Sequence, residues 1–289
     1  MEKVFFVADF FIHEVVGGAE KNDDALIEEI TRQGFDVTRV NCRDLTPDSI
    51  RSNSSSIFIL ANFVQLSFEC MLELMKTSNY IIYEHDYKLF KSRNPINYPQ
   101  FRAPSNHLMN VNFYKKAHRV VFLSQLQEDI YQRNLALTNA ENIHCSIFNN
   151  GTLNFIKSLN NIPKKHNKIA IVDSSNPIKK RDASITYCKS EELEFDLIKS
   201  PDYFTFLELL SSYEKLLILT GHPEPTPRIA VEAKMLNTQV RCQKNLIGVA
   251  SEPWYSLNGD ALIDKMKSLR KEAGSLFKKW IEEYTPNDT

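Results

Sequence analysis

The chain changes from a strand pattern to a helix pattern within one short segment, LLILTGHPEPTPRIAVEA (residues 216–233). Its first four residues are apolar and are followed by Thr220-Gly221, which is typical of a buried strand that ends at a turn. Thr226 suits the N-cap of a helix and Pro227 suits its first position, so we expect a helix from Pro227 to about residue 236. A buried strand that leads into a helix is the repeating unit of a parallel sheet.

Outward from this segment, short apolar runs alternate with helical patterns along the chain. We expect strands at residues 4–10, 36–41, 56–63, 80–83, 119–123, 143–148 and 239–242. We expect helices at residues 20–33, 68–76, 106–117, 125–135 and 260–284. Between them the alternation continues through residues 168–172, 193–198, 204–211 and 215–219. Such alternation predicts an α/β fold built from crossover units around parallel sheets.

The chain length predicts two domains, because 289 residues exceed one comfortable hydrophobic core. Residues 152–167 are polar and are interpreted as an interdomain linker. We therefore expect one domain over residues 1–158 and a second over residues 166–289, with the last helix packing back on the first. Both are predicted to be doubly wound, Rossmann-like domains that face a central cleft, with ligands at the carboxyl ends of the strands.

Composition excludes several classes of protein. Hydrophobic residues make up 43% and charged residues 25% of the chain, which excludes disorder as its main state. The formal net charge of −1 provides no global basic field for nucleic acid or an anionic membrane. No apolar run approaches the roughly 18 residues of a membrane span. Residues 4–8 are interpreted as a first strand rather than a signal peptide, because Asp9 interrupts the apolar run.

The cysteine and histidine patterns bear on compartment and on metals. The five cysteines are scattered, and their odd number gives no support to a disulfide framework, so a cytoplasmic protein is expected. The chain contains no His-x-x-x-His pair, cysteine cluster or Asp-x-Asp motif. We therefore expect no bound metal and no cofactor.

Two patterns carry the chemistry. Gly17-Gly18 precedes a helix, and glycine there lets backbone N–H groups approach an oxyanion; the alternative is an ordinary turn that needs a positive φ. Glu224 and Glu232 lie before and inside the helix that begins near Pro227. Carboxylates at these places can accept hydrogen bonds from the hydroxyls of a polyol, while free N–H groups face phosphate. The alternative is an exposed loop acid and a solvated helix acid.

The second pattern resembles the signature of retaining glycosyltransferases of the GT-B fold, above all glycosyltransferase family 4. The resemblance rests on two glutamates separated by seven residues, on the glycine pair, and on two short motifs in the predicted first domain. These motifs are Tyr83-Glu84-His85-Asp86 and Asn150-Gly151. The features occur in the family's order and span most of the chain.

The resemblance implies a role for each matching residue. Glu224 would contact the donor sugar and Glu232 the nucleotide ribose, with Pro225 and Thr226 beside them. Gly17 and Gly18 would approach the donor phosphates, and His85 would lie in the sugar pocket; a hydrogen-bonded structural histidine is the alternative. The implied catalytic residues are His85, Glu224 and Lys179.

The sequence departs from the family pattern after the first strand of the second domain. The family usually has an arginine there and a lysine a few residues on, whereas Val172 is followed by Asp173, and Lys179 matches the lysine. Lys180 and Arg181 are expected to compensate for the missing arginine; a solvated, basic helix start is the alternative.

The function expected from this resemblance is transfer of a sugar from a UDP- or GDP-linked donor, with retention of configuration and without metal. Residues 87–104 are proline-rich and basic, so Lys91, Arg93 and Arg102 are expected to bind an anionic acceptor. The acceptor could be a saccharide, a sugar phosphate or a modified nucleobase in DNA. The alternatives are a sugar-nucleotide epimerase or phosphorylase of the same fold and a noncatalytic nucleotide-sugar-binding module.

Overall fold

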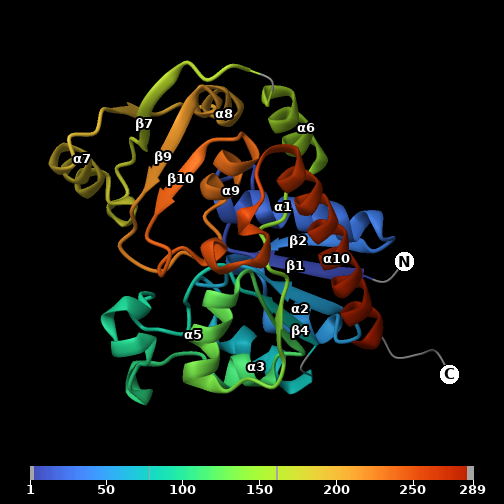
Figure 1. Cartoon of the computed structure of the whole chain (residues 1–289). Coiled ribbons are helices and arrows are strands. Elements are labelled where there is room, and N and C mark those ends of the chain that lie inside the picture. The colour runs from blue at the N-terminus through green and yellow to red at the C-terminus, as the bar shows by residue number, and fades with distance from the viewer. Residues whose placement is uncertain (1–2, 78, 161, 285–289) are drawn as a thin grey trace. The chain divides into compact units, whose positions relative to one another are not determined.

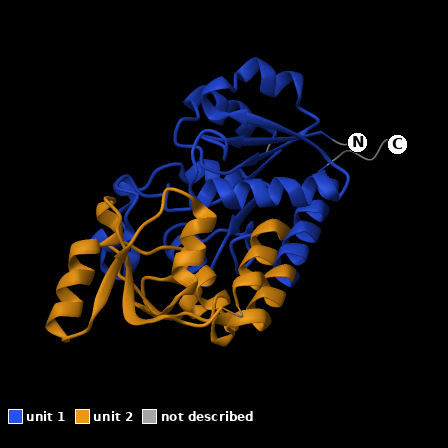
Figure 2. Cartoon of the chain, turned by 90° about the horizontal axis from the view of Figure 1, so that it is seen from above, with its two compact units in different colours: residues 1–147, 268–289 blue, residues 148–267 orange. Residues whose placement is uncertain are grey.

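The computed structural model describes residues 3–77, 79–160 and 162–284, and within them the chain forms a six-stranded and a four-stranded sheet (Figure 1). The two sheets belong to separate compact units, shown in Figure 2. Unit 1 comprises the chain up to Ile147 together with the part from Ser268 onward, and unit 2 comprises Phe148–Lys267. Each unit is described by itself below.

The sheet of unit 1 has the strand order β2-β1-β3-β4-β5-β6, and all of its neighbouring strands are parallel. Its strands are β1 (Lys3–Ala8), β2 (Asp36–Asn41), β3 (Ile57–Leu60), β4 (Tyr80–Tyr83), β5 (Arg119–Phe122) and β6 (Ala140–Asn142). The order reverses direction between β1 and β3. In open parallel sheets, ligands bind at such a reversal, outside the carboxyl ends of the strands.

Helices connect these strands, as parallel pairing requires. They are α1 (Gly18–Arg32), α2 (Pro47–Ser52), α3 (Phe68–Thr77), α4 (Val111–Lys116) and α5 (Gln125–Leu135). Short 3-10 turns lie at Cys42–Asp44, Pro95–Asn97, Pro99–Phe101 and Ser105–His107. From Ser268 onward, helix α10 (Gly259–Tyr284) also belongs to unit 1, where the ring of Phe277 meets the ring of Tyr83 edge-on at 5.6 Å.

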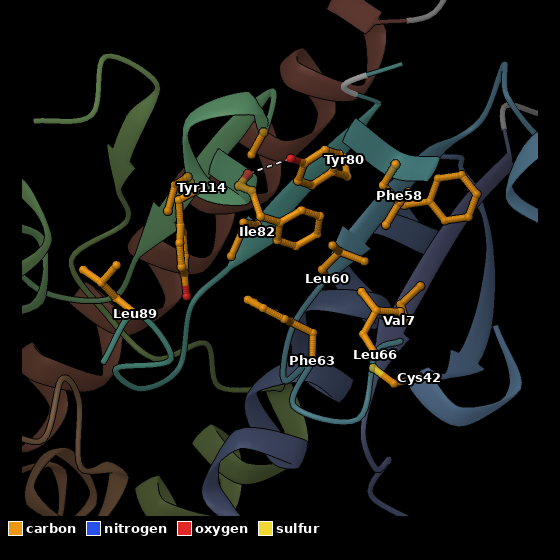
Figure 3. Close-up of a cluster of buried hydrophobic side chains, with 14 of the residues drawn as sticks. Val7, Cys42, Phe58, Leu60, Phe63, Leu66, Tyr80, Ile82, Leu89 and Tyr114 are labelled. Carbon is orange, nitrogen blue, oxygen red and sulfur yellow. Dashed lines mark hydrogen bonds between the residues drawn. The ribbon is translucent and has the colours of Figure 1, made fainter. Parts of the chain in front are cut away.

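The core of unit 1 gathers on the sheet strands and on the segments that follow them (Figure 3). Val7 of β1, Phe58 and Leu60 of β3 and Ile82 of β4 are fully buried. The Tyr80 hydroxyl donates a 2.6 Å hydrogen bond to the carbonyl oxygen of Phe113 on α4, drawn as the dashed line in Figure 3. These contacts join strands β1, β3 and β4 and helix α4 in one buried cluster.

The sheet of unit 2 has the order β10-β9-β7-β8, also with parallel neighbours. Its strands are β7 (His166–Val172), β8 (Phe195–Ile198), β9 (Tyr213–Ile218) and β10 (Gln239–Cys242). Its helices are α6 (Asn150–Leu159), α7 (Arg181–Ser190), α8 (Tyr203–Ser211), α9 (Arg228–Met235) and the start of α10, with 3-10 turns at Pro177–Lys179, Gly248–Ser251 and Pro253–Ser256. Here the order reverses between β7 and β9.

Three expectations about the elements are wrong. The first half of the segment interpreted as a linker is helix α6, whose Leu153, Ile156 and Leu159 are buried and whose N-cap Asn149 accepts a hydrogen bond from the N–H of Thr152. Strand β6 ends before the strand expected at residues 143–148, because His144 has a φ of +57°, which interrupts extended backbone. Helix α4 begins five residues later than expected.

No helix in the described part of the chain combines the length and the apolar character that a membrane span needs.

Candidate active site

The loops that follow β7 and β9 carry most of the residues predicted to bind the sugar donor. These strands are neighbours and flank the reversal of strand order in unit 2, so their following loops share one edge of the sheet. The N–H of Gly221 donates a 2.8 Å hydrogen bond to the carbonyl oxygen of Ile178 and joins the two loops. A Cβ on Gly221 would lie 2.9 Å from Cε of Lys180, near the flexible end of that side chain, and at an ordinary 3.6 Å from the carbonyl oxygen of Ile178.

Glu224 and Lys179 form an ion pair at this edge. Nζ of Lys179 lies 2.6 Å from Oε2 of Glu224. The other carboxylate oxygen, Oε1, is buried and has no hydrogen-bond partner among the described residues. The backbone of Glu224 is held on both sides, because its N–H bonds to the carbonyl oxygen of Leu246 and its own carbonyl oxygen accepts from the N–H of Gly248, each at 2.8 Å. A fixed, buried acceptor without a protein donor is unusual in proteins, and a water molecule or a ligand hydroxyl can supply the missing donor.

Glu232 lies inside α9 and is 4% exposed, so it is not a solvated helix acid. Its Oε1 accepts a 2.6 Å hydrogen bond from the hydroxyl of Tyr203, and Nε of Arg228 lies 3.6 Å from the same oxygen. The guanidinium of Arg228 in turn covers the ring of Phe148 at 3.9 Å. Burial, together with the charge of Glu232, raises the pKa of Tyr203, which therefore stays a donor. Tyr203 was not predicted, because its sequence surroundings contain no motif. Arg228 was not predicted although it lies between the two glutamates of the opening segment.

The start of α9 differs from the expectation by one residue. Pro227 is the N-cap, with φ −61° and ψ 108°, and Arg228 is the first helical residue. No side-chain hydrogen bond caps this end, because proline takes the N-cap place that was expected for Thr226. Pro225 and Thr226 are both buried in the loop before it. An uncapped helix N-terminus presents backbone N–H groups and a favourable dipole to an anion.

Lys180 and Arg181 line a pocket of about 570 Å³ beside these loops. Arg181 is bound to two carboxylates, Asp173 at 2.9 Å and Asp182 at 3.0 Å. Lys180 has a φ of +46°, which is rare for a side-chain-bearing residue, and the described residues offer it no ion-pair partner. Lys180 is therefore the better of the two as a free cation at this place. It is exposed at the N-cap of α7, which agrees with the alternative of a solvated, basic helix start.

Gly17 and Gly18 open helix α1 in unit 1, where Gly17 is the N-cap. Gly17 has a φ of −125° and a ψ of 178°, so the turn does not need a positive φ. A Cβ on Gly17 would meet only the carboxylate of Glu20, the flexible end of a side chain that can move aside. Burial raises the pKa of Glu20. The carboxyl group of Glu20 thus lies beside the glycine that was predicted to face donor phosphates.

His85 follows β4 and is held by two residues of α1. Its Nε2 lies 2.6 Å from Oδ1 of Asp23, and its Nδ1 lies 3.4 Å from the amide nitrogen of Asn22. Asn22 also donates a 2.7 Å hydrogen bond to the hydroxyl of Tyr83. These contacts are satisfied together when Nε2 carries the proton and Nδ1 accepts. The Asp23 and Asn22 partners were not predicted, although Asn22 and Asp23 interrupt the apolar, buried face of α1.

Two of the three predicted acceptor residues lie together. Lys91 and Arg93 line a second pocket, of about 430 Å³, within unit 1. Arg102 is exposed and does not line this pocket, so the structure does not bring it together with Lys91 and Arg93 at the pocket.

The predicted residues fall into two sets. Gly17, Gly18 and His85 belong to unit 1, and the set that runs from Lys179 to Glu232 belongs to unit 2. Among the described residues, no group of three or more His, Cys, Asp or Glu side chains is placed to hold a metal ion.

Comparison with solved structures identifies the fold. The chain matches sucrose-phosphate synthase from Thermosynechococcus elongatus with a TM-score of 0.62 and 11% identity, covering 96% of this chain and 99% of that one. It matches AviGT4, a glycosyltransferase involved in avilamycin A biosynthesis, with a TM-score of 0.59 and 10% identity. The match covers 98% of this chain and 97% of AviGT4. It matches Anabaena HepE, solved in complex with UDP and glucose, with a TM-score of 0.56 and 12% identity. The match covers 96% of this chain and 100% of HepE.

No family model matches the chain, and no curated protein matches it. The solved neighbours are GT-B glycosyltransferases, they are covered almost completely, and the two parallel sheets of this chain correspond to theirs. The predicted fold class is therefore confirmed: the chain has the α/β fold of the GT-B glycosyltransferases.

Proposed function

We propose that the protein is a glycosyltransferase that takes a sugar from a nucleotide-diphosphate donor held by unit 2. The observation that carries the proposal is the buried Oε1 of Glu224, which has no hydrogen-bond partner among the described residues while Oε2 is paired with Lys179. A hydroxyl of the donor sugar would supply the missing donor. The GT-B fold and the position of Glu224 beside the strand-order reversal support this assignment.

The surrounding groups fit the rest of such a donor. Lys179 and the uncapped start of α9 offer positive charge to a diphosphate, and Lys180 adds a cation nearby. Glu232 is buried next to Tyr203 and would accept hydrogen bonds from ribose hydroxyls. Pro225 and Thr226 form the buried loop that joins the two glutamates.

The residues of unit 1 have roles in the same proposal. His85 is oriented by Asp23 and would contact the donor sugar. The backbone at Gly17 and Gly18 would approach the donor phosphates once the flexible Glu20 side chain moves aside.

Transfer is proposed to retain the anomeric configuration and to need no metal. The leaving phosphate oxygen would take the proton of the acceptor hydroxyl as that hydroxyl attacks the same face of the sugar. Lys179 and the helix dipole would stabilise the negative charge that develops on the diphosphate. No separate general base is required for this step.

The test of the donor site is thermal stability in the presence of UDP, GDP and their sugar conjugates. A ligand that binds only the native state raises the melting temperature. We expect at least one of these compounds to do so, and we expect an excess of chelator to leave the shift unchanged. A shift that appears only with Mg²⁺ or Mn²⁺ would contradict the metal-free site.

Replacement of Glu232 tests the ribose contact. Glu232→Gln should weaken the binding of the bare nucleotide by about tenfold, because a hydrogen bond to a charged group is lost. Glu208→Gln, an exposed change on α8, is the matched control and should bind like the wild type. Calorimetric titration of the nucleotide into each variant measures the difference, and equal affinities would leave Glu232 with a purely structural bond to Tyr203.

The reaction products distinguish the proposed transferase from an epimerase and from a noncatalytic binding module. A transferase releases nucleoside diphosphate from the donor, whereas an epimerase of the same fold returns a nucleotide sugar with altered stereochemistry. A noncatalytic binding module leaves the compound unchanged. Chromatography of a reaction containing the stabilising nucleotide sugar distinguishes these outcomes.

A further inference from the structure

The pocket of about 430 Å³ in unit 1 lies between the segments that follow β3 and β4. Its walls are mainly apolar and include Phe63, Leu66 and Phe90, all buried. Three more apolar lining residues are solvent-exposed: Phe68 at 67%, Val64 at 53% and Met109 at 45%. Exposed apolar residues gathered around one hollow favour a ligand that carries an apolar group.

The same pocket has a positive lining. Lys88, Lys91 and Arg93 contribute to it, and its lining contains no carboxylate. Lys88 and Arg93 are both bound to Asp86, and Lys88 also to Glu84. Although burial opposes ionisation of Asp86, these two cations hold the pKa of its carboxyl well below the usual range. Lys91 is exposed and has no ion-pair partner among the described residues, so it is the cation left for a ligand.

The pocket is already built in the absence of a ligand. Nζ of Lys88 lies 5.0 Å from the centre of the Phe63 ring and 3.5 Å from the side-chain oxygen of Asn62, which ties the β4 loop to the β3 loop. Arg93 and Asn110, two lining residues, have φ values of +52° and +55°. Such backbone conformations are costly for residues other than glycine and cluster at binding sites.

The pocket is poorly equipped for a neutral saccharide. A sugar needs many hydrogen-bonding partners, and the only neutral polar side chain in the lining is that of Asn110, whose amide nitrogen lies 3.4 Å from the carbonyl oxygen of Lys88. An apolar group would instead cover Phe68 and Met109 and remove their surface from water. An adjoining anionic group would meet Lys91.

We propose that this pocket binds the acceptor, and that the acceptor is a small compound in which an apolar group adjoins an anionic group such as phosphate. This rests on the proposed transferase function and names the chemistry of its second substrate. Lys91 would bind the anionic group, and Phe68 and Met109 would pack against the apolar group. Lys91 thus keeps the anion-binding role expected from the sequence, and the apolar wall is an addition that the sequence did not indicate.

The experiment titrates 1-naphthyl phosphate into the full-length protein without a sugar donor, with 1-naphthol and inorganic phosphate as the two partial ligands. We expect saturable binding of 1-naphthyl phosphate, at least tenfold tighter than either partial ligand. We also expect it to persist in saturating UDP, because the donor nucleotide is proposed to bind unit 2, away from this pocket's lining. Displacement by UDP would overturn the proposal, because the compound would then occupy the donor phosphate site.

Two pocket variants and two matched controls separate the contributions. Lys91→Gln should weaken 1-naphthyl phosphate about tenfold and leave 1-naphthol unaffected, because only the charged contact is lost. Phe68→Ala should weaken both compounds about fivefold, because apolar contact is lost. Lys116→Gln and Leu72→Ala change exposed residues outside the lining and should bind like the wild type.

The outcome is separable from that of the donor experiment. Absence of 1-naphthyl phosphate binding in a protein that still binds a nucleotide sugar would overturn the acceptor assignment and leave the transferase proposal standing. Equal affinities for the wild type and both pocket variants would overturn it as well. Binding of a DNA oligonucleotide but not of 1-naphthyl phosphate would replace the small acceptor by a nucleic acid.

Discussion

Glu224→Gln is expected to lower kcat for sugar transfer by about a hundredfold or more, with little change in the affinity for the bare nucleotide. The substitution keeps the shape of the side chain, and the amide oxygen can still accept the hydrogen bond that Lys179 donates at 2.6 Å. It removes the negative charge from the carboxylate whose Oε1 has no partner among the described residues. The loss should therefore fall on the step in which the sugar is transferred.

The control for this variant is Glu214→Gln. Glu214 is an exposed residue of β9, the strand that precedes the Glu224 loop, so the same chemical change is made without touching the site. Its kcat should equal that of the wild type. A Glu224→Gln enzyme with wild-type kcat and wild-type donor affinity would mean that Glu224 serves only as the structural partner of Lys179.

Lys179→Met is expected to lower kcat/KM for the donor by about a hundredfold to a thousandfold. The ammonium group of Lys179 is the cation in contact with Glu224, and it is proposed to stabilise the diphosphate as it leaves. Its loss also leaves the 8%-exposed Glu224 without a counter-charge, so the melting temperature should fall. Lys179→Arg should recover part of the rate, because a cation is restored at this place. Lys189→Gln, an exposed change on α7, is the matched control.

A double-mutant cycle shows whether the pair acts as a unit. If Lys179 and Glu224 act together, the double variant Lys179→Met/Glu224→Gln should lose much less than the product of the two single losses. It should also recover melting temperature relative to Lys179→Met, because the buried charge is gone. Fully multiplicative rate losses would contradict a joint role for the two residues.

The fold was predictable wherever a local pattern and the sheet topology agree. Strand β4, most of β1 and the second half of β9 are apolar runs, and the helices after β1 and β9 begin near Gly17 and Pro227 as expected. Strand β6 was misplaced because it is a half-exposed three-residue edge strand, Ala140–Asn142, with no apolar alternation. Helix α6 was missed because asparagines and lysines obscured its buried apolar stripe.

The site was predictable as residue types and not as contacts. Glu224 and Glu232 stood out because their spacing resembles a family signature. The ion pair of Lys179 with Glu224 joins residues 45 positions apart, and the contact of His85 with Asp23 joins residues 62 apart. Only the parallel pairing of the sheet strands brings such residues together. The apolar wall of the unit 1 pocket was unpredictable for the same reason, since Phe68 and Met109 have no motif around them.

The most direct test of the central claim is the release of nucleoside diphosphate from a panel of UDP- and GDP-linked sugars, measured in the presence of chelator. Donor cleavage without an acceptor is slow but requires the same donor site. We expect release from at least one compound by the wild type and by Glu214→Gln, with release reduced about a hundredfold in Glu224→Gln. Release at equal rates in all three proteins, or no release from any compound by any of them, would contradict this expectation.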